Sequence, residues 1–335
     1  MYEQTKKELD SLVTKGIVPG ISYAFITHDQ VEKKIFGQKQ LVPVKKPLVG
    51  GELYDLASLT KVIGTTTVIL KLAEQGKLAI DDPVQKYLIR FTDQRVTLRH
   101  LLTHTSALSG YIKDRDHLPP KELLTALYTL RPKAWLGKKV VYADIGLILL
   151  GEVIEVFYGR PVQEVIASEV LAPLQMKEST FTPEKNRCVP TEITAERGLI
   201  QGEVHDPKAY ILGKHCGSAG LFAPLDDLII FAQWLLGKRR PLRPIVTAET
   251  LTMLFRDHTP TRRLGRSLGW DLRYDPKGQA CLYHTGFTGT FIVIDRKNQT
   301  ALIVLSNRIH PSADNEPFLK WRDVIVSDYL REKES

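Results

Sequence analysis

Residues 55–64, Asp-Leu-Ala-Ser-Leu-Thr-Lys-Val-Ile-Gly, place a reactive pair of side chains at the head of a long apolar segment. Ser58 and Lys61 are three residues apart, so on a helix both side chains lie on one face near its N-terminus. An amine within hydrogen-bond reach can take the proton of a serine hydroxyl while that oxygen attacks a carbonyl carbon. The unpaired N–H groups of a helix N-terminus would stabilise the resulting oxyanion. An S-x-x-K spacing also occurs by chance as a capping serine followed by a solvated lysine. Whether this pair is catalytic therefore depends on partner residues elsewhere in the chain.

Hydrophobic periodicity gives the organisation around this stretch. Helical spacing from residue 57 to 75 predicts a mostly buried helix that Gly76 ends. Further helices are predicted at 2–15, 121–130, 145–158, 162–171, 225–236 and 316–331, with a small one within 96–106. Strands are predicted at 21–27, 31–36, 268–274, 281–285, 289–295 and 301–307, the first two joined as a hairpin around His28, Asp29 and Gln30.

The order of these elements predicts an α+β fold. Because the strands come from the two ends of the chain and most helices from its middle, we expect one antiparallel sheet flanked by helices in a sandwich. The predicted sheet domain is discontinuous, residues 1–65 with 205–335, and residues 66–204 form an inserted, mainly helical domain. We expect the active site in the cleft where the two parts meet.

Composition excludes several classes of protein. With 43% hydrophobic and 25% charged residues in 335, the chain is typical of a soluble globular protein, and no apolar run approaches the roughly 18 residues of a membrane span. Residues 1–10 lack the apolar core of a signal peptide, so we expect a cytoplasmic location unless a leader has been removed. Three widely spaced cysteines, Cys188, Cys216 and Cys281, fit a reducing compartment.

No cofactor, metal or nucleic acid is expected. The net charge of +8 includes basic clusters at 238–243 and 262–266, but no aromatic residues are interleaved with them, so solvated loops are expected. His100 and His104 have a spacing that could ligate a metal, yet no third ligand stands nearby, which favours structural histidines. We expect a small-molecule or peptide substrate, and the oligomeric state is not predicted.

Two further tripeptides are candidates for the cleft. Tyr142-Ala143-Asp144 directly precedes the apolar helix at 145, and His284-Thr285-Gly286 ends or interrupts a strand. Gly286 would let a substrate backbone approach the strand edge closely. Each tripeptide alone is equally typical of a surface tyrosine or of an ordinary strand end.

In this order the three motifs resemble the serine β-lactamase and penicillin-binding protein superfamily, in its class C β-lactamase-like branch with D-alanyl-D-alanine carboxypeptidase and esterase relatives. Tyr142-Ala143-Asp144 is similar to the Y-x-N motif and His284-Thr285-Gly286 to the H-T-G form of K-T-G. Residues 101–106, 174–176, 202–206 and 217–222 match the branch as well. The resemblance covers roughly residues 10 to 325 and implies a β-lactamase/transpeptidase-like fold.

The resemblance implies a role for each site residue. Ser58 would form an acyl-enzyme, while Lys61 and Tyr142 would share the work of the general base, because cations beside a phenol favour its ionised form. The backbone N–H groups of Ser58 and Phe287 would hold the oxyanion. His284 and Thr285 would bind the carboxylate or carbonyl end of the substrate, and a cationic imidazole would make that contact pH-dependent.

Asp144 departs from the family pattern. An asparagine amide can donate a hydrogen bond to a substrate carbonyl, whereas an ionised aspartate can only accept. Near Lys61 it should hold that amine protonated, which shifts the base role toward Tyr142. Both the contact with an amide substrate and β-lactam hydrolysis are thereby weakened.

The alternatives differ in nucleophile and in turnover. Gly265-Arg266-Ser267-Leu268-Gly269 fits the G-x-S-x-G elbow, although a strand-like segment and not a helix follows it. We expect a serine hydrolase that acts through Ser58 on a D-amino-acid peptide, amide or small ester. A class C-type β-lactamase and a penicillin-binding sensor that stays acylated are the alternatives, and turnover separates the sensor from the enzymes.

Overall fold

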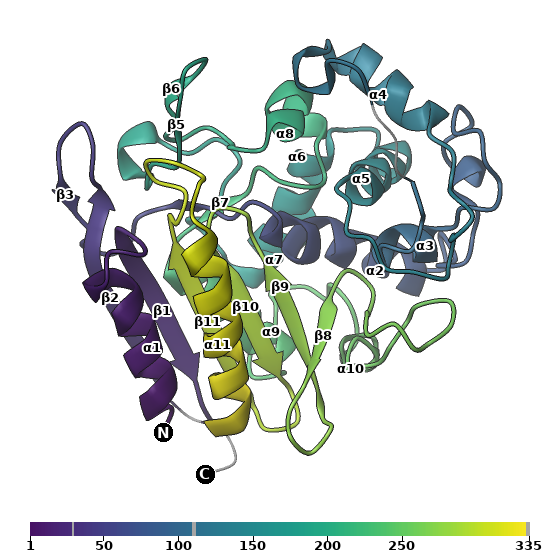
Figure 1. The fold of residues 1–335 in the computed structure, drawn as a ribbon. Helices are drawn as coiled ribbons and strands as arrows, with labels where there is room; N and C mark the ends of the chain where they lie inside the picture. The colour runs from purple at the N-terminus through teal and green to yellow at the C-terminus, as the bar shows by residue number, and fades with distance from the viewer. Residues whose placement is uncertain (29, 109–111, 333–335) are drawn as a thin grey trace.

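Both ends of the chain contribute strands to one antiparallel sheet (Figure 1). The structure is a computed structural model and describes residues 1–28, 30–108 and 112–332, which leaves Asp29 of the predicted hairpin turn outside the described residues. Within them, seven strands have the order β3-β2-β1-β11-β10-β9-β8. Their bounds are β1 Gly20–Ile26, β2 Val31–Gln40, β3 Lys46–Pro47, β8 Asp271–Tyr274, β9 Ala280–Thr285, β10 Phe291–Asp295 and β11 Thr300–Ser306. The predicted sheet is therefore confirmed, and β1 pairs directly with β11 in its middle.

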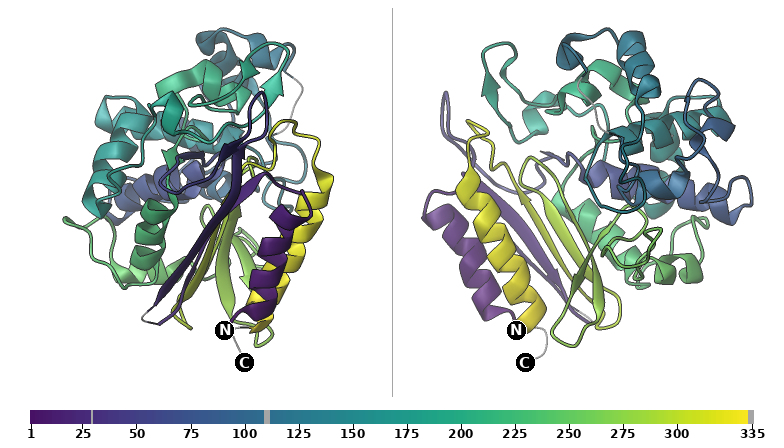
Figure 2. Two further views of the ribbon diagram at one scale, coloured as in Figure 1. Left: turned by 90° about the vertical axis from the view of Figure 1, so that its left-hand side faces the viewer. Right: turned by 45° about the vertical axis from the view of Figure 1, so that its right-hand side comes forward.

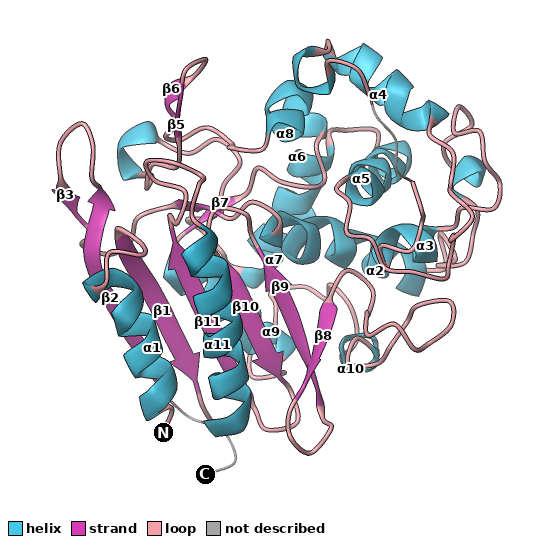
Figure 3. Ribbon diagram, in the orientation of Figure 1, coloured by secondary structure: helices cyan, strands magenta, loops and turns pink. Residues whose placement is uncertain are grey.

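Helices from the two chain ends cover one face of the sheet. α1 (Glu3–Thr14) and α11 (Glu316–Glu332) lie side by side on it, as the turned views in Figure 2 show. Thr5 at the start of α1 donates its hydroxyl proton to the carboxylate of Glu332 at 2.6 Å. Apolar residues of both helices pack on the inward side chains of β1, β10 and β11. The other face carries α9 (Leu225–Leu235), and the helical part of the chain lies beyond it (Figure 3).

The middle of the chain is mainly helical. Its helices are α2 Thr66–Glu74, α3 Leu98–Leu102, α4 Pro120–Thr129, α5 Ile145–Tyr158, α6 Val162–Ile166, α7 Ala172–Leu174, α8 Pro207–Leu212 and, later in the chain, α10 Ala248–Met253. Short strands β4 Tyr54–Asp55 and β7 Phe222–Ala223 pair with each other, and β5 Ile193–Thr194 pairs with β6 Gly198–Leu199. No helix among the described residues is both long enough and apolar enough to cross a bilayer. The domain boundaries after residues 65 and 204 stay a prediction.

The helix predicted from residue 57 to 75 begins with a wide turn. Lys61–Thr65 form a π-helical turn, η1, before the regular helix α2. A Cβ atom on Gly64 would lie 2.7 Å from Ile166, and the Thr65 hydroxyl donates to the carbonyl of Gly217 at 2.6 Å. These contacts fix the wide turn, and turns of this kind are frequent at functional sites.

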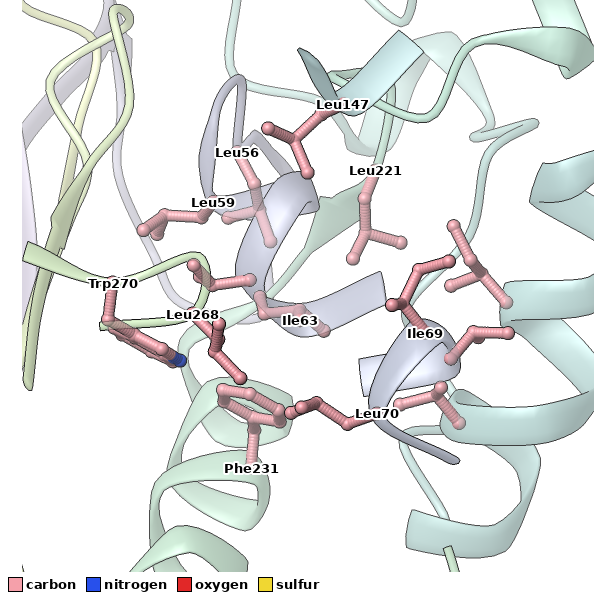
Figure 4. Packing of buried hydrophobic residues seen from close by; sticks show 14 of the residues in the cluster. Leu56, Leu59, Ile63, Ile69, Leu70, Leu147, Leu221, Phe231, Leu268 and Trp270 are labelled. Carbon is pink, nitrogen blue, oxygen red and sulfur yellow. The ribbon is translucent and has the colours of Figure 1, made fainter. Parts of the chain in front are cut away.

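A continuous apolar core supports this helix. Leu59, Ile63, Ile69 and Leu70 project from it toward residues of α5, α9 and the segment before β8 (Figure 4). A reactive side chain at the head of such a buried helix is held rigidly, because its backbone cannot move without disturbing the packing.

Two isoleucines offer a matched test of this packing. Ile69 in α2 is 0% exposed, whereas Ile89 is 85% exposed. We expect Ile69→Ala to lower the free energy of unfolding by about 2–5 kcal/mol, because the deletion leaves a cavity. Ile89→Ala should change it by less than about 0.5 kcal/mol. Urea denaturation of both variants measures the difference, and similar losses would contradict the assigned core.

Candidate active site

A strained residue precedes Ser58. Ala57 has a φ of 46°, in the left-handed region that disfavours residues with a Cβ by about 1–2 kcal/mol. The carboxylate of Asp55 compensates, because it accepts a hydrogen bond from the Ala57 N–H at 2.8 Å and another from the His205 N–H at 2.8 Å. Burial raises the pKa of Asp55, while these two bonds lower it in part. Asp55 thus ties the backbone before Ser58 to the segment at 205.

The turn between β9 and β10 clamps the same backbone. The hydroxyl of Thr288 donates to the carbonyl of Asp55 at 2.7 Å, and that of Thr290 donates to the carbonyl of Leu56 at 3.2 Å. A Cβ atom on Gly286 would lie 2.5 Å from the Leu56 oxygen. Gly286 therefore allows Leu56 of the chain itself to approach closely, and the close approach of a substrate backbone stays a prediction.

Lys61 is a buried cation with an acceptor for each of its N–H groups. Its Nζ atom lies 2.7 Å from Ser58 Oγ, 2.9 Å from the carbonyl oxygen of Ser218 and 2.8 Å from Asp144 Oδ1. Its side chain is 1% exposed, and burial alone would lower its pKa, but Tyr142 and Asp144 outweigh burial and raise it. The amine is therefore an ammonium that donates to the serine oxygen.

Asp144 bridges two lysines at the start of α5. Its Oδ1 pairs with Lys61, and its Oδ2 pairs with Lys208 at 3.0 Å. Burial raises the pKa of Asp144, but the two ammonium groups hold it well below its usual range. Lys208 also pairs with Asp206 at 3.1 Å. Sequence reasoning missed Lys208, because its partner Asp144 is distant in the sequence.

The phenol of Tyr142 stands among cations and imidazoles. Its ring centroid lies 5.3 Å from Lys61 Nζ and 5.9 Å from the guanidinium carbon of Arg266. The rings of His104 and His284 lie 4.4 and 6.0 Å away, respectively. Tyr142 is nevertheless 45% exposed, so its oxygen can meet a substrate while its ring is held in place.

His284 is a buried, neutral imidazole. It is 3% exposed, and its Nδ1–H donates to the carbonyl of Thr285 at 3.0 Å. Burial, followed by the charges of Arg266 and Lys61, lowers its pKa well below 6.5. The predicted cationic anchor with a pH-dependent contact stays a prediction, and the burial and the two cations, which sequence alone did not show, argue against it. Thr285 lies half-buried at the end of β9.

A cavity of about 310 Å³ brings four of the eight predicted site residues together. Ser58, Tyr142, Asp144 and Phe287 line it, with Ala57, Arg115, His205, Asp206, Pro207, Lys208 and Ala219. The ring of Phe287 is 51% exposed and stacks on that of His205 at 5.4 Å. A larger cavity of about 450 Å³ between β8 and α11 holds none of the predicted residues. Lys61 lies beneath Ser58, and His284, Thr285 and Gly286 lie outside the lining.

Two backbone amides at this cavity are available to an oxyanion. Among hydrogen bonds between described residues, the N–H groups of Ser58 and Phe287 donate to no acceptor. The carbonyl of Phe287 accepts from the Arg308 guanidinium at 2.8 Å, which fixes the turn that carries this amide. The predicted oxyanion pair is thus present in space, while its role stays a prediction.

The competing nucleophile lacks its structural context. Ser267 is buried, its N–H donates to the carbonyl of Trp270, and strand β8 follows it instead of a helix.

The two histidines with metal-ligand spacing have structural contacts. The imidazole of His100 accepts from the Thr97 N–H at 3.1 Å and caps α3, and His104 accepts from the Ala143 N–H at 3.3 Å. Across the described part of the chain, no group of three His, Cys, Asp or Glu side chains could hold a metal ion.

Comparison with known proteins identifies the family. A profile described as Beta-lactamase matches residues 6–323. A relative from Escherichia coli O157:H7 named "Putative D-alanyl-D-alanine carboxypeptidase" is 30% identical, over 88% of this chain and 80% of the relative. A solved structure described as "A class C beta-lactamase" has a TM-score of 0.79 at 18% identity, with 98% of this chain and 95% of that chain covered. Another solved structure, described as "EstCE1, a hydrolase with promiscuous acyltransferase activity", has a TM-score of 0.76 at 20% identity, with 96% of this chain and 97% of that chain covered.

The profile spans most of the chain, and the structural similarities confirm the expected β-lactamase/transpeptidase-like fold. By family the protein is a serine-type hydrolase. The chain belongs to the Beta-lactamase family.

Proposed function

We propose that this protein is a serine hydrolase that forms an acyl-enzyme through Ser58 and acts on a D-amino-acid peptide, amide or small ester. The observation that carries the proposal is the hydrogen bond of 2.7 Å between Lys61 and the Ser58 hydroxyl, at the floor of a cavity that Tyr142 also lines. The carboxypeptidase name of the relative and the acyltransferase activity ascribed to EstCE1 support acyl transfer from such substrates.

In the proposed mechanism Tyr142 is the general base. Lys61 is saturated as a donor, so it cannot take a proton from Ser58 without giving up one of its own. The Ser58 oxygen attacks the substrate carbonyl, its proton passes to the phenolic oxygen of Tyr142 as general base, and the oxyanion is held by the amides of Ser58 and Phe287. The proton then passes to the leaving group as the scissile bond breaks. Water releases the acyl group by the reverse sequence of proton transfers.

Labelling tests the nucleophile. We expect a fluorescent fluorophosphonate to label the wild type and Ser267→Ala, and to leave Ser58→Ala unlabelled, because Ser58 alone of these two serines lines the cavity. Labelling that survives in Ser58→Ala and disappears in Ser267→Ala would overturn the proposal.

A turnover assay separates the alternative functions. A β-lactamase turns over nitrocefin, an esterase turns over p-nitrophenyl esters, and a stoichiometric sensor turns over neither.

The general base can be tested with a matched pair of tyrosines. Tyr142→Phe should lower kcat/KM for a p-nitrophenyl ester by about 10²- to 10⁴-fold, because it removes the proton acceptor and keeps the ring. Tyr210 is 53% exposed in α8, and Tyr210→Phe serves as the control with little change. An active Tyr142→Phe enzyme beside an inactive Lys61→Met enzyme would assign the base to Lys61.

The neutral state of His284 predicts how stability depends on pH. Below its ordinary pKa of 6.5 the unfolded chain binds a proton at this residue and the folded chain does not, so lowering the pH favours unfolding. We expect the free energy of unfolding to fall between about pH 7.5 and 5.5, and His284→Gln to reduce that slope. His28→Gln, at an exposed position, should keep the wild-type slope. Denaturant titrations across this range measure it, and an unchanged slope in His284→Gln would show that folded His284 takes up a proton.

A further inference from the structure

A chain of alternating charges forms one wall of the Ser58 cavity. Lys61 pairs with Asp144 at 2.8 Å, Asp144 with Lys208 at 3.0 Å, and Lys208 with Asp206 at 3.1 Å. Asp144, Lys208 and Asp206 line the cavity, while Lys61 lies beneath it. The two ammonium groups and two carboxylates sum to zero charge, so this wall is ionic and yet electrically balanced.

Asp144 cannot supply a hydrogen-bond donor to a substrate. Both of its oxygens already accept from an ammonium group, and the lysines keep the carboxyl ionised. An ionised carboxylate has no proton to donate. If the wall offers a donor to the substrate, that donor must come from another residue.

Lys208 has the capacity that Asp144 lacks. An ammonium group has three N–H donors, and within residues 1–28, 30–108 and 112–332 the partners of Lys208 are Asp144 and Asp206, which engage two of them. The residue lies in the first turn of α8, and its side chain is 10% exposed, at the cavity. Its neighbour Asp206 caps that helix by accepting the Ala209 N–H at 2.8 Å, so the base of the side chain is fixed.

We propose that Lys208 is a substrate-binding residue that donates its third N–H to an amide carbonyl beside the scissile bond. This inference rests on the proposed function and narrows the preferred substrates to acyl groups that carry an amide, such as N-acylated D-amino acids.

The charges of the wall favour a neutral acceptor. A substrate carboxylate at Lys208 would face both Asp144 and Asp206, and like charges at such distances repel. The other cation of the lining, Arg115, pairs with Asp116 at 3.0 Å and so adds no net charge. A carbonyl oxygen accepts from an ammonium without meeting this repulsion.

A pair of esters tests the proposal. Wild type and Lys208→Met are compared on the p-nitrophenyl esters of N-acetyl-D-alanine and of an unsubstituted fatty acid of similar length. Lys208→Met should lower both rates, because Asp144 loses a partner, but the ratio of kcat/KM for the amide-bearing ester over the plain ester should fall about tenfold or more. Lys33 forms a surface pair with Asp226 at 2.8 Å, and Lys33→Met is the control whose ratio stays at the wild-type value.

A second comparison removes the role of Lys208 as counter-ion of Asp144. Asp144→Ala is compared with the double variant Asp144→Ala/Lys208→Met. Neither variant has a carboxylate at position 144 that could be left without a partner, and in Asp144→Ala the lysine still pairs with Asp206. The ester ratio should fall by a similar factor between these two, and this holds even if Lys208→Met alone fails to fold. An unchanged ratio in the folded pairs would overturn the proposal and leave Lys208 as a counter-ion of Asp144. Absence of Ser58-dependent fluorophosphonate labelling in the wild type would instead overturn the proposed function itself.

Discussion

The buried ammonium of Lys61 is the interaction on which the site depends. A cation removed from water is costly unless each of its donors finds an acceptor. Here the acceptors are Ser58 Oγ, the Ser218 carbonyl and the Asp144 carboxylate, which belong to three segments far apart in the chain. Satisfying one side chain therefore fixes the relative positions of the nucleophile, the loop before β7 and the start of α5. The π-helical turn belongs to the same arrangement, because Thr65 bonds to Gly217 beside Ser218.

The sheet contributes the second constraint, which acts on the backbone. Strand β4 runs into the strained Ala57, and the geometry persists because Asp55 and Leu56 are bonded on all sides by Ala57, His205, Thr288 and Thr290. Strain of this kind is retained only where the surroundings hold it. Ser58 consequently sits where the sheet side, through the β9–β10 turn, and the helical side, through α5 and α8, both reach the cavity.

The parts of the fold that could be predicted are those encoded locally. The apolar run of α5 gave bounds identical to the observed Ile145–Tyr158, and the strands at the two chain ends form the expected sheet. The π-helical turn could not be predicted, because it depends on the contact of Gly64 with Ile166. The motifs named four of the residues that line the cavity, but the neutral state of His284 follows from burial beside Arg266 and Lys61, which no local pattern records. Lys208 was missed for the same reason. Its partner Asp144 is distant in the sequence, and a nearby carboxylate such as Asp206 is common beside a lysine.

Asp144 shows how one residue sets the charge and hydrogen bonding of the cavity wall formed by Lys61, Asp144, Lys208 and Asp206. An asparagine here would be a neutral group that both donates and accepts. The aspartate adds a negative charge that keeps Lys61 protonated and also pairs with Lys208. Lys208 in turn pairs with Asp206. The two ammonium groups and two carboxylates balance, so this wall presents no net charge to a substrate. A site arranged in this way selects by the direction of its hydrogen bonds more than by attraction of ions, which fits substrates whose recognised groups are amide carbonyls.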